Sequence, residues 1–251
     1  MSGHSKWATI KHQKGAKDKA RGKLFAKLIR QVEVAAREGG GDIETNATLR
    51  SMFTKARDAS VPTDTIERAI KRGTGELEGV RYEQVSYEGY APGGVAVYVE
   101  ALTDNRNRTG PDIRSTFSKL GGSIAEPGAV AWQFERKGVV VLEKSVEEDD
   151  LMLVVLEAGA EDLIDDGDTW RVVSEASALT AVRAALEEAG IPFDSAEVTM
   201  LPTTSVPLET AEGAKKVLRL IDALDDHDDV QGVYANFDIP DDVLQAVGVE
   251  A

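Results

Sequence analysis

The residues whose type and spacing suggest chemistry are the cations of the first thirty positions, interrupted by a single acid, Asp18. Lysine and arginine neutralise phosphates and release counterions from a nucleic acid, so an arm making roughly six or more such contacts binds with steep salt dependence. Trp7 could stack on a base, or alternatively anchor the arm on a neighbouring domain. We therefore predict a nucleic-acid-binding segment formed by Lys6, Trp7, Lys11, Lys14, Lys17, Lys19, Arg21, Lys23, Lys27 and Arg30.

The charge of the chain is distributed unevenly between this segment and the remainder. Sixteen Lys/Arg and eight Asp/Glu occur through Arg72, whereas thirteen Lys/Arg and thirty-six Asp/Glu follow, and the whole chain carries a net charge of −15. A run of charge is often only a solvated face, but this contrast in sign favours a polyanion-binding end. The acidic remainder would repel the polyanion and orient the molecule on it. The hypothesis requires cations that the chain's own carboxylates do not neutralise.

A second candidate anion contact is the stretch Asn105-Arg106-Asn107-Arg108, which follows a predicted strand and enters a predicted helix. Two guanidinium groups beside free helix N–H groups would form an anion site. The alternative is that Arg106 and Arg108 form ion pairs with acids across a domain interface. The sequence supports both interpretations equally.

Catalytic and metal-binding patterns are weak in this sequence. It has no cysteine and three histidines, and it lacks a nucleophile elbow, a Walker A loop and a dinucleotide-binding glycine motif. The acidic stretch at 225–229 (DDHDD) suggests either a metal site or a solvated turn, and 165–168 (DDGD) either half a calcium loop or a hairpin turn; turns are favoured for both. We predict a non-enzymatic protein without catalytic residues, cofactor or metal. The alternative is an enzyme with a phosphate site in the cleft between the two α/β domains, near Asp104, Arg106 and Arg108.

The N-terminal part is predicted to be a basic arm followed by a small helical domain, together spanning residues 1–75. Glycines, including Gly22, should keep residues 1–22 from forming a helix. From residue 23 an apolar stripe predicts a helix that ends at the glycines of 39–41. Further helices are expected at 45–58 and after Pro62, where Asp64 and Glu67 resemble a capping box.

Alternating apolar residues then predict a mainly α/β region. Strands are expected at 82–90, 95–102 and 130–134, with a helix beginning near Thr109. Residues 138–203 read β-α-β-β-α-β, the order of a ferredoxin-like domain. A helix at 210–224 and a strand at 230–237 are too few to form a core, so they should complete the earlier piece. The predicted fold class is α+β, with domains 1–75, 80–136 plus 204–240, and an inserted 138–203.

Four separated motifs resemble the YebC/PmpR family over essentially the whole chain: Gly3-His4-Ser5-Lys6-Trp7, Glu88-Gly89-Tyr90-Ala91-Pro92-Gly93-Gly94, Leu102-Thr103-Asp104-Asn105-Arg106-Asn107-Arg108 and Phe134-Glu135-Arg136-Lys137-Gly138. The resemblance implies three domains, one helical and two α/β. It also implies a regulator of gene expression, either a DNA-binding transcriptional regulator or a ribosome-associated factor that helps translation through proline-rich stretches. A mitochondrial relative is the translational activator of cytochrome c oxidase subunit I. The family has no agreed catalytic residues.

The expected partner is therefore nucleic acid, either duplex DNA or ribosomal RNA, and the ribosome itself under the second alternative. No apolar run approaches the roughly 18 residues of a membrane span, and no apolar segment follows the basic N-terminus as in a secretory signal. We predict a cytoplasmic protein with no membrane partner. The oligomeric state is left open.

Overall fold

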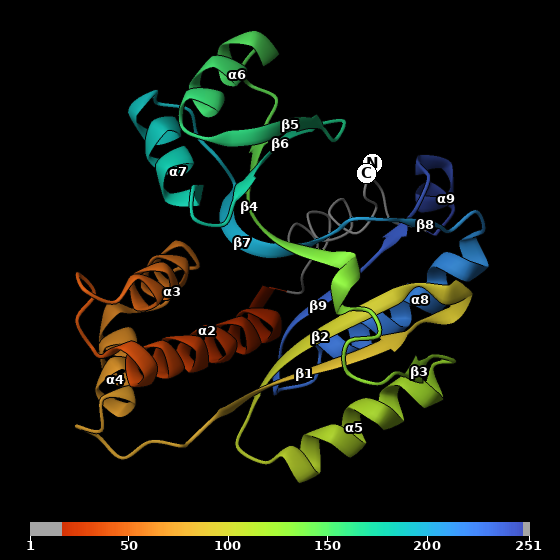
Figure 1. Cartoon of the computed structure of the whole chain (residues 1–251), viewed down its shortest axis with the longest axis horizontal. Coiled ribbons are helices and arrows are strands. Elements are labelled where there is room, and N and C mark those ends of the chain that lie inside the picture. The colour runs from red at the N-terminus through yellow and green to blue at the C-terminus, as the bar shows by residue number, and fades with distance from the viewer. Residues whose placement is uncertain (1–16, 248–251) are drawn as a thin grey trace.

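The computed structural model describes residues 17–247 of the chain. Figure 1 shows three groups of elements: helices at the N-terminal end and two sheets, each accompanied by its own helices. Each of the two larger sheets has four strands, and all of their strand pairs are antiparallel. This arrangement confirms the predicted α+β class.

Three helices pack together at the N-terminal end: α2 (Lys17–Gly39), α3 (Ala47–Asp58) and α4 (Thr63–Gly73). Their apolar faces meet in a core that includes Leu28, Val32, Leu49 and Ile66. Asn46 joins two of the helices, since its side-chain oxygen accepts from Leu49 N–H while its amide donates to the carbonyl of Ala35. This side chain is the N-cap of α3.

Two local predictions for this region were wrong. Helix α2 begins at Lys17 and continues through Gly22, where we expected an interruption. A single exposed glycine costs a helix only about 1 kcal/mol, which a long helix tolerates. At α4 the N-cap is Pro62 and makes no side-chain capping bond, so Asp64 lies in the first turn rather than at the cap. Pro62 occupies the N-cap position, and its ring has no oxygen that could accept from a backbone N–H group, so the predicted capping box does not form.

The first sheet has the strand order β3-β1-β2-β9. Its strands are β1 (Glu83–Tyr90), β2 (Ala96–Thr103), β3 (Ser123–Ile124) and β9 (Val230–Ala235). Helices α5 (Arg106–Lys119) and α8 (Ala211–Asp225) cover one face, where Val97 and Val99 pack against Phe117 and Leu220. Because β9 pairs with β2, the chain returns to this sheet after forming the second one. The loops at the ends of β2 and α8 are thereby brought together.

The second sheet has the order β5-β6-β4-β7, the arrangement of a ferredoxin-like unit. Its elements are β4 (Phe134–Glu143), α6 (Glu148–Glu157), β5 (Ala160–Asp165), β6 (Thr169–Glu175), α7 (Leu179–Glu188) and β7 (Ser195–Pro202). Both helices pack on one face, around Val140, Leu151, Val182 and Leu186.

The strand predicted at 130–134 is absent: a short 3-10 helix (Ala131–Gln133) occupies it, and β4 begins only at Phe134. Glu88 explains the local geometry, because its buried carboxylate accepts from the backbone N–H groups of Gly128, Val130 and Ala131. Those N–H groups are therefore unavailable to a strand ladder. Beyond this turn, Phe134 lies 6.2 Å from Tyr98, measured between ring centroids, where β4 crosses the first sheet.

The remaining elements complete the first sheet's side of the molecule. They are a 3-10 helix (Pro92–Gly94), the short parallel pair β8 (Val206–Pro207) and β10 (Phe237–Asp238), and α9 (Asp241–Ala246), which the sequence analysis did not anticipate. Between residues 17 and 247, no helix is both long and apolar enough to cross a membrane.

Candidate functional site

The predicted nucleic-acid-binding residues fall into four groups in the structure. Lys6, Trp7, Lys11 and Lys14 lie outside the described residues. Lys17 and Lys19 belong to the first turns of α2, and their side chains are also outside the description. Arg21 is exposed, with its guanidinium 5.6 Å from the centroid of the Phe25 ring. The last group, Lys23, Lys27 and Arg30, contacts another part of the chain.

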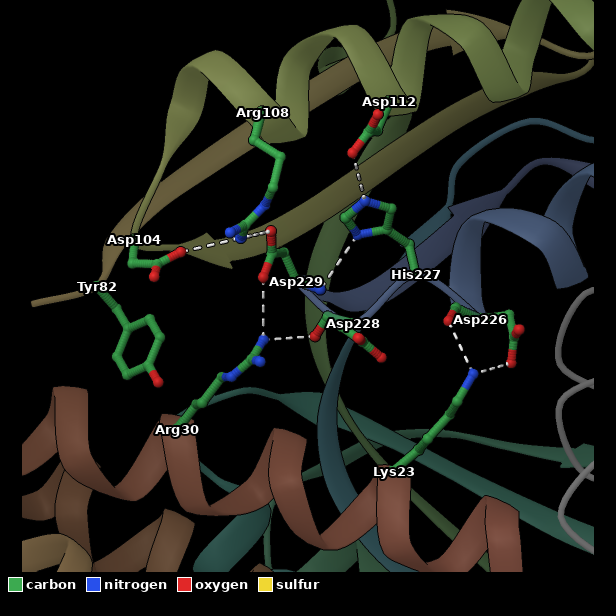
Figure 2. Close-up of a pocket in the computed structure, with 10 residues that line it drawn as sticks. All are labelled: Lys23, Arg30, Tyr82, Asp104, Arg108, Asp112, Asp226, His227, Asp228 and Asp229. Atoms are coloured by element: carbon green, nitrogen blue, oxygen red, sulfur yellow. Dashed lines mark hydrogen bonds and ion pairs between the residues drawn. The ribbon is translucent and has the colours of Figure 1, made fainter. Parts of the chain in front are cut away.

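These three residues form the cationic face of α2, with spacings of four and three residues that align them on one side of a helix. All three side chains contact residues 225–229, the acidic segment that ends α8 and precedes β9. Figure 2 shows Lys23 and Arg30 pointing at this segment. Lys23 pairs with the Asp226 carboxylate, Lys27 with the Asp225 carboxylate at 3.0 Å, and Arg30 with the Asp229 carboxylate at 3.3 Å. The chain's own acids thus neutralise this part of the predicted segment.

Each of the three cations also bonds to a backbone carbonyl of the acidic segment. Lys23 donates to the Asp226 carbonyl at 3.0 Å, Lys27 to the Asp225 carbonyl at 2.8 Å, and Arg30 to the Asp228 carbonyl. The last carbonyls of a helix have no partner within it, and the helix dipole places partial negative charge there. Lys23 and Lys27 therefore satisfy backbone carbonyls at the C-terminal end of α8, and Arg30 bonds to a carbonyl just beyond it.

Asp229 is the buried centre of this contact, with a side chain only 4% exposed. Its carboxylate accepts from Arg108 Nη2 and from Thr109 Oγ1, both at 2.7 Å, in addition to its contact with Arg30. Burial disfavours the charged carboxylate, but the hydrogen bonds from Arg108 and Thr109 and the charges of Arg108 and Arg30 outweigh it. The pKa of Asp229 consequently lies below its usual value.

The two arginines of the second candidate anion contact behave differently. Arg108 pairs with Asp104 at 2.9 Å and with Asp229, so it forms ion pairs, but with acids of its own domain rather than across a domain interface. The Arg106 side chain is 64% exposed, and its nearest acid, Glu83, lies 3.9 Å away. Helix α5 begins at Arg106, three residues earlier than expected, because Asn105 caps it by accepting from Arg108 N–H. Arg106 is the more exposed of the two, since the Arg108 side chain is 48% exposed and held by two carboxylates.

A cleft of about 630 Å³ lies between α2, the start of α5 and the acidic segment (Figure 2). Its lining carries three cations and five carboxylates: Lys23, Arg30, Arg108, Asp104, Asp112, Asp226, Asp228 and Asp229. His227 and Tyr82 complete it, and the His227 Nδ1 atom accepts from Asp229 N–H at 3.1 Å. An excess of carboxylates repels phosphate groups. The cleft also separates the helical domain from the first sheet, whereas the enzyme alternative placed it between the two α/β domains.

The acidic stretches make turns and ion pairs. In the part of the chain that the structure describes, no group of three or more His, Asp or Glu side chains is placed to hold a metal ion. Residues 165–168 form the turn of the β5–β6 hairpin, where Asp165 accepts from Gly167 N–H at 2.8 Å and pairs with Lys144.

Sequence reasoning missed the role of the acidic segment as the partner of α2. The sequence favours a solvated turn there, although the four carboxylates of the segment are the signal that could have suggested a counterpart for Lys23, Lys27 and Arg30. The periodicity of α2 shows that these cations face away from the helical core, but not what they face.

Comparisons with known proteins cover nearly the whole chain. Residues 5–76 match the family description "TACO1/YebC protein N-terminal domain", and residues 82–237 match "TACO1/YebC second and third domain". Proteins from Mycolicibacterium smegmatis (58% identical over 252 residues) and Halothermothrix orenii (53% over 253 residues) are both named probable transcriptional regulatory protein, with 100% of each chain covered. The crystal structure of a conserved hypothetical protein, Aq1575, from Aquifex aeolicus superposes with a TM-score of 0.82 at 46% identity, covering 92% of this chain and 96% of that one.

Proposed function

The chain belongs to the TACO1/YebC family, and from this premise we propose that it is a non-enzymatic regulator of gene expression that binds nucleic acid through its N-terminal arm. The naming of its relatives as probable transcriptional regulatory proteins supports the regulatory part of the proposal. It favours DNA as the target and a cytoplasmic location where DNA is accessible. Binding through the N-terminal arm is supported by the distribution of charge along this chain.

The observation that carries the proposal is the separation of charge between the arm (residues 1–22) and the body (the residues after Arg72). From Lys6 to Arg21 the chain has six cations and one acid, whereas the residues after Arg72 hold an excess of 23 negative charges. Because Lys23, Lys27 and Arg30 are paired with the acidic segment, the proposal rests on the cations that precede them in the arm. Counterion release from such contacts is sufficient for non-specific affinity.

The charge of the body also favours an orientation in which the arm faces the nucleic acid. The acidic body would be repelled by a polyanion, so the arm would approach first. Arg106, exposed at the start of α5, is the candidate for a second contact. Arg108 contributes less in the conformation described, since Asp104 and Asp229 hold its guanidinium.

The enzyme alternative receives little support from the cleft. A site for a phosphorylated substrate requires an excess of cations, and the lining has more carboxylates than cations. The translation alternative is compatible with the same charges, because a cationic arm also suits folded ribosomal RNA. The experiment below therefore uses both kinds of target.

The test is a titration of labelled promoter DNA and of purified ribosomes between about 50 and 200 mM salt. The wild type is compared with a variant in which Lys11, Lys14, Lys17 and Arg21 are all changed to Glu. A control variant reverses four exposed cations of the body instead: Arg114, Lys119, Lys215 and Arg219.

We expect the arm variant to lose binding and any residual binding to show a shallower salt slope, while the control retains the wild-type slope. Preferential binding of ribosomes over DNA would assign the protein to translation. Equal binding by the arm variant and the wild type would overturn the proposal that the arm is the contact.

A further inference from the structure

The helical domain contacts the rest of the chain through polar side chains. In the part of the chain that the structure describes, its buried apolar cluster contains only residues between Phe25 and Ile70, and no other apolar cluster includes them. Besides the cationic face of α2, two ion pairs link α3 to the domain of the second sheet: Lys55 with Glu197 of β7 at 2.6 Å, and Asp58 with Arg183 of α7 at 2.7 Å. The domain is thus held largely by charge.

Such an interface can open. Ion pairs near the surface are individually weak and are screened by salt, and domains that share no apolar core move relative to one another by default. The connection between Gly73 and β1 is made of exposed residues, apart from Tyr82. A rotation of the helical domain would therefore break few apolar contacts.

The acidic segment presents α2 with a surface that resembles a nucleic-acid backbone. Its carboxylates and carbonyl oxygens accept from Lys23, Lys27 and Arg30 in the way that phosphate oxygens would. From residue 23 to residue 30 the helix rises about 10 Å. That length corresponds to about three phosphates of one DNA strand, at roughly 3.4 Å of axial rise each.

The body holds this surface in place independently of α2. Asp229 is bonded to Arg108 and Thr109, which belong to the body, and its backbone N–H donates to His227. The acidic segment would keep this anchoring if Arg30 moved away. It is therefore a preformed partner for the cations rather than a loop that orders around them.

We infer that the acidic segment (residues 225–229) is an internal competitor of nucleic acid, which covers a second nucleic-acid-binding surface, the cationic face of α2. In the closed form described here, the face is occupied by the protein's own carboxylates. Nucleic acid captured by the arm competes with the acidic segment for this face. In the wild type the segment keeps the face at low salt; where the segment is weakened, the helical domain rotates away and Lys23, Lys27 and Arg30 add phosphate contacts. This inference rests on the proposed function, since it assumes that the arm binds nucleic acid.

The test compares two variants that make the same change in net charge. Asp225→Asn with Asp226→Asn removes the carboxylates that face Lys23 and Lys27 but keeps the size of both side chains. The control, Asp149→Asn with Asp150→Asn, lies in the exposed first turn of α6 in the second sheet's domain. Binding of a labelled short duplex DNA is measured between about 50 and 200 mM salt.

We expect the first variant to bind about tenfold more tightly at low salt, with a log–log salt slope steeper by roughly 2, since Lys23 and Lys27 lose their carboxylate partners and each added phosphate contact contributes about 0.9. The control should keep the wild-type slope. Adding Lys23→Gln and Lys27→Gln to the first variant should restore the wild-type slope, whereas the same two changes alone should alter it little. Equal slopes for the two aspartate variants would overturn the inference.

A second measurement requires no nucleic acid. Small-angle X-ray scattering of the full chain should show a larger radius of gyration for Asp225→Asn/Asp226→Asn than for the control at low salt, and an increase for the wild type as salt is raised. Lys23→Gln/Lys27→Gln opens the same interface from the other side, so a folding defect in one variant leaves the other available. If neither of these two variants has a larger radius of gyration than the wild type, the opening of the interface between α2 and the acidic segment is refuted. Loss of DNA binding by the wild type would instead refute the proposed function.

Discussion

Arg108 Nη2 lies 2.7 Å from Asp229 Oδ2, and this pair joins the start of α5 to the segment that precedes β9. Asp229 also accepts from Thr109, and it is the acid that both the helical domain and the first sheet contact. One carboxylate thus fixes the position of the acidic segment against which α2 packs.

Replacing Asp229 by Ala should destabilise the protein by about 1–3 kcal/mol, because Thr109 and Arg108 would lose an acceptor in a buried site. The measurement is urea unfolding followed by circular dichroism. Asp104→Ala is the control, since it removes the other, exposed partner of Arg108 and should cost under about 1 kcal/mol. Equal losses in the two variants would contradict a central role for Asp229.

Stability should decrease on acidification through Glu88 and Asp229. Burial alone would raise the pKa of Glu88, but the backbone N–H groups of Gly128, Val130 and Ala131 outweigh it and lower that pKa. A carboxyl group whose pKa is lowered by folding stabilises the protein above its unfolded pKa, about 4, and this stabilisation is lost as the pH falls through the folded pKa. Unfolding free energy measured from neutral pH downward should therefore fall most steeply below about pH 4.

Glu88→Gln isolates the contribution of this carboxylate to the pH dependence. The amide cannot accept from all three N–H groups, so the variant should be less stable at neutral pH by about 1–3 kcal/mol. Its stability should also depend less on pH between about 4 and the acid limit. A pH profile parallel to that of the wild type would show that Glu88 does not contribute.

Two glycines in the helical domain should respond oppositely to alanine. A Cβ atom at Gly73 would lie 2.4 Å from the Glu33 carbonyl oxygen, where α4 crosses α2, so Gly73→Ala should destabilise by about 1–3 kcal/mol. At Gly22 an added Cβ meets nothing within 4 Å, and alanine favours the helix, so Gly22→Ala should stabilise by about 0.5–1 kcal/mol. Thermal unfolding of the two variants measures both effects, and a destabilising Gly22→Ala would argue against a continuous α2.

Arg106→Gln should weaken nucleic-acid binding modestly and reduce the salt slope by about 0.9, the share of one phosphate contact. The reason is that Arg106 is exposed at the N-terminus of α5, where the helix dipole also favours an anion. Arg114→Gln, another exposed cation of the same helix, is the matched control and should leave the slope unchanged. Equal slopes in both variants would remove Arg106 from the interface.

Much of the fold was predictable because its elements are encoded by neighbouring residues. The apolar stripe of α2, the alternation in β1 and β2, and the β-α-β-β-α-β order of the second sheet all follow from periodicity over a few residues. Some wrong predictions misjudged a residue close by, such as Gly22 or Pro62, whereas the missing strand was decided by a distant group. Glu88, some forty residues earlier in the chain, takes up the N–H groups of the predicted strand at 130–134.

The sequence by itself determined the opposite charges of the N-terminal segment and the body, and hence the kind of partner that the arm could bind. Only the tertiary structure decided which cations the carboxylates of the body neutralise. Lys23 and Asp226 are 203 residues apart, and they meet because β9 returns to the first sheet and places the end of α8 beside α2. Charge is a property of each residue, whereas neutralisation depends on which oppositely charged groups the folded chain brings within a few ångströms.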